Sequence, residues 1–161
     1  MTETIDTLII AGYGRNNGEK ATIPFVLANI EIEDRSKRVE VVLMFDAAPL
    51  AIRGAADGFS IGAPFETHDL ATRMRIFMDG GGILNVCTPC LIHRGIDNEP
   101  TMDGVVRING RVVMEKKDRE TKILSFAGRS HSQAHVGVAS SRVEDLAGVH
   151  DARWVENAFD L

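Results

Sequence analysis

The chain has 161 residues and a formal net charge of −5, and its length fits one globular domain with a buried core. Its 44% hydrophobic and 25% charged residues exclude a disordered chain. Its acidic balance gives no reason to expect nucleic acid as a partner, because proteins that follow phosphates carry a basic face.

No apolar run approaches the roughly 20 residues that cross a bilayer, so no membrane span is expected. The acidic N-terminus, residues 1–6, lacks the basic and apolar parts of a signal peptide, and a cytoplasmic location is therefore expected. In that compartment the two cysteines of this chain are typical of a reactive or metal-binding site rather than of a structural disulfide.

Short apolar runs alternate with segments of helical periodicity through the first 126 residues. The runs predict five strands, at residues 7–11, 39–45, 83–86, 105–108 and 121–126. A first helix is predicted to end near Glu31, and because Pro24 suits only a first turn, the start is expected near residues 21–23. Further helices are predicted at residues 47–56, 67–79 and 110–120. This alternation is typical of an α/β fold with a parallel sheet covered by helices on both faces.

The first strand leads into a glycine-rich turn, residues 12–20, whose composition is that of a nucleotide-binding loop. A phosphate loop needs a lysine directly after its second glycine, and here Glu19 follows Gly18. The dinucleotide fingerprint fails as well, because Asn17 occupies the position of its third glycine. The segment is therefore predicted to be a plain turn, and no cofactor is expected.

Both cysteines lie in one segment that joins the third predicted strand to a short helix. Cys87 is at the carboxyl end of that strand, the edge of a parallel sheet where reactive groups collect. Pro89 favours a helix that starts directly afterwards, and a helix N-terminus lowers the pKa of a nearby thiol. His93 and Arg94 add positive potential. Cys87 is therefore predicted to be a reactive thiolate.

The spacing between Cys87 and Cys90 leaves three interpretations of the second thiol open. Cys90 can be the resolving partner of a redox dithiol, or a small residue of the core. A metal site would have to add histidines such as His93, His131 or His135, since the chain has no further cysteine. Because only half of a typical ligand set is local, no metal is predicted.

An apolar strand that ends at Cys87, a short helix, and a closing Arg94–Gly95 form a pattern that resembles the DsrE/TusD (DsrE/DsrF) family of sulfur-relay proteins. The generic strand and helix pattern from about residue 5 to residue 126 fits the same family. The resemblance implies a three-layer α/β/α fold with a parallel five-stranded sheet. It also implies a homo-oligomer, a trimer or a hexamer. Residues 1–126 then form the DsrE-like domain, and residues 127–161 are a C-terminal extension expected to dock on the same or a neighbouring subunit.

In that family the cysteine carries sulfane sulfur as a persulfide, and the matching residue in this sequence is Cys87. The leading hypothesis is a sulfur carrier or sulfurtransferase-like protein that takes sulfur from a donor protein onto Cys87 and passes it to an acceptor cysteine. His93 and Arg94 would support the anionic persulfide. One alternative is a thiol–disulfide redox protein that uses Cys87 and Cys90. Another is a non-catalytic oligomeric binding protein.

Overall fold

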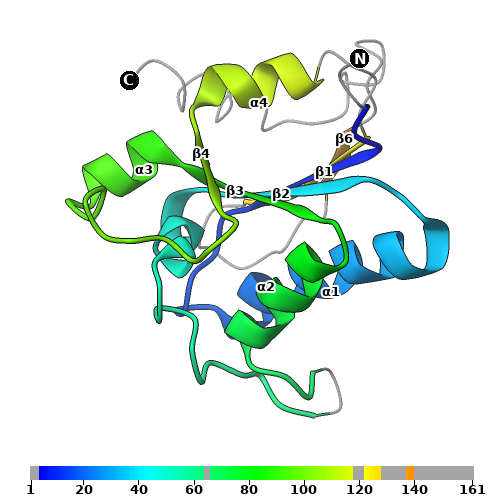
Figure 1. Cartoon of the computed structure of the whole chain (residues 1–161), viewed down its shortest axis with the longest axis horizontal. Coiled ribbons are helices and arrows are strands. Elements are labelled where there is room, and N and C mark those ends of the chain that lie inside the picture. The colour runs from blue at the N-terminus through cyan, green and yellow to red at the C-terminus, as the bar shows by residue number, and fades with distance from the viewer. Residues whose placement is uncertain (1–3, 64–65, 118–121, 128–136, 140–161) are drawn as a thin grey trace.

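The computed structural model describes residues 4–63, 66–117, 122–127 and 137–139, and these residues build one twisted sheet (Figure 1). In spatial order, its strands are β4 (Val106–Ile108), β3 (Ile83–Cys87), β2 (Val39–Leu43), β1 (Thr7–Ala11), β5 (Lys122–Phe126) and β6 (Gly137–Ala139). The first five are mutually parallel, which confirms the predicted parallel five-stranded sheet. β6, which pairs antiparallel with β5, comes from the predicted extension.

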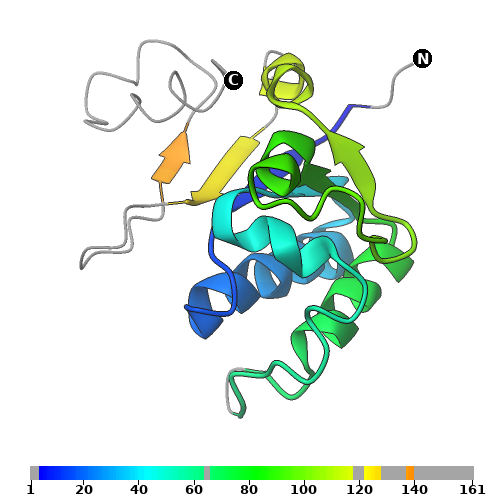
Figure 2. The ribbon, with the colours of Figure 1, turned by 90° about the vertical axis from the view of Figure 1, so that its left-hand side faces the viewer.

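Helices cover both faces of the sheet, as the sequence predicts. α1 (Gly18–Arg35) and α2 (Leu70–Asp79) lie on one face, and α4 (Gly110–Lys117) lies on the other. Figure 2 shows the same three layers after a turn of 90°. Two short elements directly follow strands: the 3₁₀ helix η1 (Phe45–Ala51) follows β2, and α3 (Thr88–His93) follows β3. In the part of the chain described above, no helix is long and apolar enough to cross a membrane.

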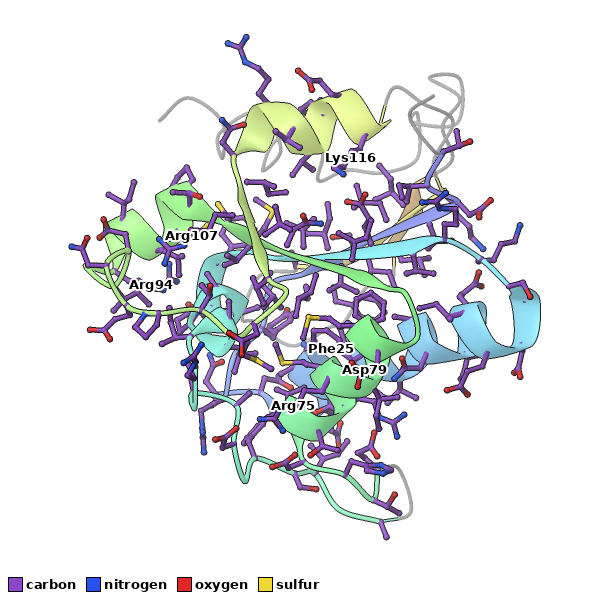
Figure 3. All side chains as sticks on the ribbon, in the orientation of Figure 1. Phe25, Arg75, Asp79, Arg94, Arg107 and Lys116 are labelled. Atoms are coloured by element: carbon purple, nitrogen blue, oxygen red, sulfur yellow. The ribbon has the colours of Figure 1, made fainter. Side chains whose placement is uncertain are left out.

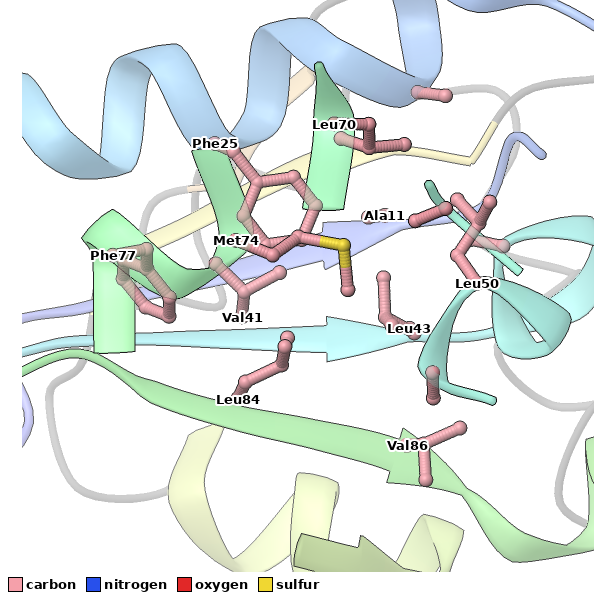
Figure 4. Packing of buried hydrophobic residues seen from close by; sticks show 14 of the residues in the cluster. Ala11, Phe25, Val41, Leu43, Leu50, Leu70, Met74, Phe77, Leu84 and Val86 are labelled. Atoms are coloured by element: carbon pink, nitrogen blue, oxygen red, sulfur yellow. The ribbon is translucent and has the colours of Figure 1, made fainter. Parts of the chain in front are cut away.

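Alternating side chains of the strands divide the core into two parts. On the α1 and α2 face, Phe25, Met74 and Phe77 pack against strand residues such as Val41 and Leu84 (Figure 4). The rings of Phe25 and Phe77 meet edge to face with centroids 6.0 Å apart. The α4 face carries a smaller apolar cluster: Leu8, Ile10, Val42, Met44, Cys87, Ile108 and Val113. The Cys87 side chain therefore lies on the face that α4 covers.

The first helix begins earlier than the sequence analysis predicts. α1 starts at Gly18, and the Asn17 side chain accepts a hydrogen bond from the Lys20 backbone N–H at 3.3 Å. Pro24 consequently lies inside the helix, where it removes one backbone hydrogen bond. The expected start near residues 21–23 is wrong because this N-cap, which leads the chain into the helix, outweighs the local cost of the proline.

A buried charged pair joins α4 to the sheet. Glu40 of β2 is 2% exposed, and its carboxylate oxygens lie 2.6 and 2.5 Å from the Lys116 ammonium. Asn85 of β3 donates a third hydrogen bond to Glu40 at 3.0 Å. Figure 3 shows Lys116 pointing from α4 toward the sheet. Since Asn85 and Cys87 share one face of β3, this pair holds α4 over the face that contains the Cys87 thiol.

The substitution Lys116→Met should lower the free energy of unfolding by about 3 kcal/mol at neutral pH, because it leaves the Glu40 carboxylate buried without a counter-charge. Urea denaturation followed by circular dichroism measures the loss. The double variant Glu40→Gln, Lys116→Met is the control: it removes both charges and should recover most of the stability. An unchanged unfolding midpoint in the single variant would contradict the role given to this pair.

Candidate functional site

The two thiols are in direct contact at the carboxyl end of β3. Cys87 is the last residue of the strand and is 6% exposed, whereas Cys90, in α3, is half-buried. Their Sγ atoms lie 2.8 Å apart. The short helix predicted after Cys87 is confirmed, with Pro89 in its first turn. This helical turn brings the second sulfur back over the first.

Cys90 also accepts a hydrogen bond from the end of the neighbouring strand. The backbone N–H of Phe45 points at Cys90 Sγ with a nitrogen–sulfur distance of 3.3 Å. Phe45 follows β2 and has a φ of 49°, a left-handed conformation that is unusual for a bulky residue and costs about 1–2 kcal/mol. Backbone strain of this kind clusters at functional sites. Here it accompanies a backbone donor that points at a sulfur atom.

The glycine-rich turn after β1 packs closely against Phe45 and Asp46. A Cβ atom at Gly12 would lie 2.7 Å from Ala127 Cβ and 3.4 Å from the Phe45 ring. A Cβ atom at Gly14 would overlap the carbonyl oxygen of Asp46. The turn therefore needs glycine at both positions in order to lie against residues 45 and 46. This confirms the prediction of a turn and gives its two glycines a packing role.

Arg94 supplies positive charge beside the thiols. One guanidinium nitrogen donates to the Cys90 carbonyl oxygen at 3.2 Å, and another lies 2.9 Å from the Asp46 carboxylate. Gly95 then ends the segment with a φ of 65°. The structure thus brings Arg94 to the cysteines, as expected. His93 is exposed at the end of α3, and its supporting role stays a prediction.

These contacts shift the pKa values of the two thiols in opposite directions. The hydrogen bond between the two sulfurs, the Phe45 N–H and the Arg94 charge lower the pKa of Cys90 to about 6, although burial opposes the change. The same hydrogen bond and its own burial raise the pKa of Cys87. The directions of the two shifts favour the state in which Cys90 is the thiolate and Cys87 keeps its proton.

Sequence reasoning placed Cys87, Cys90 and Arg94 correctly in one neighbourhood but missed Phe45. No side-chain motif marks a backbone N–H that acts from a neighbouring strand, and the only available signal was the position of Phe45 at a strand end. His131 and His135, considered as metal ligands, lie outside the described residues. Within those residues, no group of three or more histidine, cysteine, aspartate or glutamate side chains is placed to hold a metal ion.

The fold is shared with a protein of known structure. The crystal structure of the ychN protein from E. coli, a DsrE-like fold protein, matches with a TM-score of 0.63 and 22% sequence identity. The match covers 76% of this chain and 99% of that chain. No family model matches the sequence. No curated protein matches it either. At this identity the likeness shows the fold alone.

The alkylation rate of Cys90 should rise with pH through a midpoint near pH 6 and level off above it, because the thiolate is the reacting form. A free cysteine has its midpoint at about pH 8.5. Iodoacetamide kinetics at a series of pH values, with tandem mass spectrometry to locate the first adduct, measure the profile. The midpoint is the useful readout, since a thiolate of low pKa is also intrinsically less nucleophilic.

In Arg94→Gln the midpoint should move upward, because the positive charge beside Cys90 is lost. Arg75→Gln is the matched control: Arg75 makes an exposed pair with Asp57 and lies on α2, away from Arg94 (Figure 3). A first adduct on Cys87, or a midpoint that stays near pH 8.5, would contradict the acidity assigned to the pair.

Proposed function

We propose that this protein carries sulfane sulfur on its cysteine pair, accepting a sulfur atom from a donor persulfide and passing it to a cysteine of an acceptor protein. The proposal rests on the surroundings of the Cys90 sulfur: it contacts the Phe45 N–H and the Cys87 thiol, and Arg94 lies beside it. The fold shared with YchN and the resemblance of the cysteine segment to DsrE/TusD proteins support the same function.

The loading step needs a thiolate and a place for a second sulfur atom. The thiolate attacks the outer sulfur of the donor persulfide, a new sulfur–sulfur bond forms, and the donor leaves as a thiolate. The sulfane sulfur keeps its oxidation state, so the step needs no oxidant or reductant. Hydrogen-bond donors and positive charge around a sulfur anion favour such a step.

The resemblance to the DsrE/TusD family implies that the persulfide forms on Cys87, and that assignment stays a prediction. The contacts of the pair favour Cys90 as the thiol that reacts first, because Cys90 is the more exposed sulfur and holds the thiolate. We therefore propose loading at Cys90, with Cys87 as its proton-bearing partner. A homo-oligomer, a trimer or a hexamer in the cytoplasm, with donor and acceptor proteins as partners, remains part of this proposal.

A dithiol–disulfide redox function is the second candidate. The 2.8 Å between the sulfur atoms favours it, since a disulfide bond of about 2.05 Å needs only a small further approach. A redox protein would use both thiols in every turnover, whereas a carrier needs only one of them to load.

Loading is tested with the single variants Cys87→Ser and Cys90→Ser, each reduced and mixed anaerobically with glutathione persulfide. Cys87→Ser should gain about 32 Da, one sulfur atom, because it keeps the thiolate position and a hydroxyl donor beside it. Cyanide should then remove the sulfur as thiocyanate, since the outer sulfur of a persulfide is open to a nucleophile. Cys90→Ser should load at least about tenfold more slowly, because its remaining thiol, Cys87, is 6% exposed and burial disfavours its thiolate.

Two other results would each have a distinct meaning. Equal or faster loading of Cys90→Ser would return the persulfide to Cys87, as the sequence predicts, and would contradict loading at Cys90. If neither variant gains sulfur, the carrier function itself is wrong.

A further inference from the structure

A sulfur atom loaded on Cys90 creates a second reactive bond beside Cys87. The inner sulfur of such a persulfide is Cys90 Sγ, which lies 2.8 Å from Cys87 Sγ. Attack on a sulfur–sulfur bond runs in line with that bond, so the outer sulfur would have to point away from Cys87. Cys90 is half-buried whereas Cys87 is 6% exposed, and this difference in exposure favours that orientation.

We propose that the pair also reduces sulfane sulfur to sulfide: the Cys87 thiol attacks Cys90 Sγ of the loaded persulfide, expels the outer sulfur as hydrosulfide and leaves a Cys87–Cys90 disulfide. This inference rests on the proposed function for its loading step. It adds a reaction that a carrier does not perform, in which bound sulfur is released by the protein itself.

The atoms and electrons of this step balance. The bond between Cys90 Sγ and the outer sulfur breaks, and a bond between Cys87 Sγ and Cys90 Sγ forms. The outer sulfur leaves with the bonding pair, reduced from sulfane sulfur to sulfide, and the two cysteine sulfurs are oxidised to a disulfide. The proton of the Cys87 thiol ends on the leaving sulfur, which departs as HS⁻.

The environment of the two sulfurs suits these roles. Cys87 sits in the apolar cluster under α4 and is 6% exposed, so an outside acceptor has little access to it, but it touches Cys90. The Phe45 N–H holds the Cys90 sulfur in place against this neighbour. Transfer to an acceptor uses the exposed outer sulfur, whereas release as sulfide uses the inner one. The two outcomes therefore start from the same loaded state.

Turnover requires a dithiol reductant, a partner class that a simple carrier does not need. A dithiol would attack the half-buried Cys90 Sγ of the disulfide, form a mixed disulfide, and then release it through its own second thiol. Both cysteines return to the reduced state, and the reductant leaves as a disulfide. The net reaction converts one sulfane sulfur and two thiols into sulfide and a disulfide.

A single-turnover reaction tests the inference with the full chain. Reduced wild-type protein and Cys87→Ser are each mixed under argon with one equivalent of glutathione persulfide and no other thiol, because a free thiol would itself reduce the persulfide. The wild type should release about one equivalent of hydrosulfide and lose about 2 Da, the two hydrogens of a new disulfide. Cys87→Ser should keep a gain of about 32 Da and release only the background sulfide, since serine cannot complete the disulfide.

The outcomes separate this inference from the carrier function. A wild-type protein that keeps the added sulfur and releases no more sulfide than Cys87→Ser overturns the inference and leaves the carrier function intact. If the wild type releases sulfide but Cys87→Ser does not gain sulfur, the persulfide forms on Cys87 and Cys90 is the attacking thiol. That result overturns loading at Cys90. If neither protein gains sulfur and neither loses about 2 Da, the loading step is wrong and the proposed function fails with it.

Discussion

The hydrogen bond from the Phe45 N–H to Cys90 Sγ is the interaction on which the candidate site depends. It joins residues 45 apart in the sequence, and it exists because β2 and β3 are parallel neighbours whose carboxyl ends meet at one edge. The donor residue, Phe45, has a left-handed φ, and the turn that holds Gly12 and Gly14 packs closely against residues 45 and 46. The Cys90 sulfur on α3 is thus reached by a backbone donor that follows the neighbouring strand β2.

The charges around the pair explain how one thiol ionises without a second base. Arg94 donates to the Cys90 carbonyl and binds Asp46, so its positive charge near the sulfur is partly balanced by a carboxylate. The larger stabilisation of the Cys90 thiolate comes from two short-range hydrogen bonds, with the Cys87 sulfur first and the Phe45 N–H second. Hydrogen bonds to an ionised acceptor are stronger than those to a neutral one, so both donors favour the anionic form of the Cys90 sulfur.

Local sequence signals predicted the parts of this site that are local in the chain. The apolar run before Cys87, Pro89 after it and the closing Gly95 were sufficient for the strand, the helix and the bend. The parts that escaped prediction depend on contacts between distant segments. The acidity of Cys90 needs Phe45 from another strand, and the buried Glu40 needs Lys116 from a helix 76 residues away. The periodicity of apolar residues does not encode such pairs. A buried charged residue in a central strand, such as Glu40, even breaks the apolar pattern by which the strand is recognised.

The closeness of the two thiols makes storage and release of sulfur compete, and this competition gives the buried cysteine a function. A carrier that only stores sulfur is best served by one thiolate with no second thiol in reach, since any neighbouring thiol opens a route to the disulfide. This chain instead places Cys87 in contact with Cys90, under a helix fastened by a buried charged pair. The proton-bearing state of Cys87 slows its attack, because a thiol is a poorer nucleophile than a thiolate. Under the proposed function, an acceptor that arrives promptly would take the outer sulfur, and a loaded site left without an acceptor would release it as sulfide.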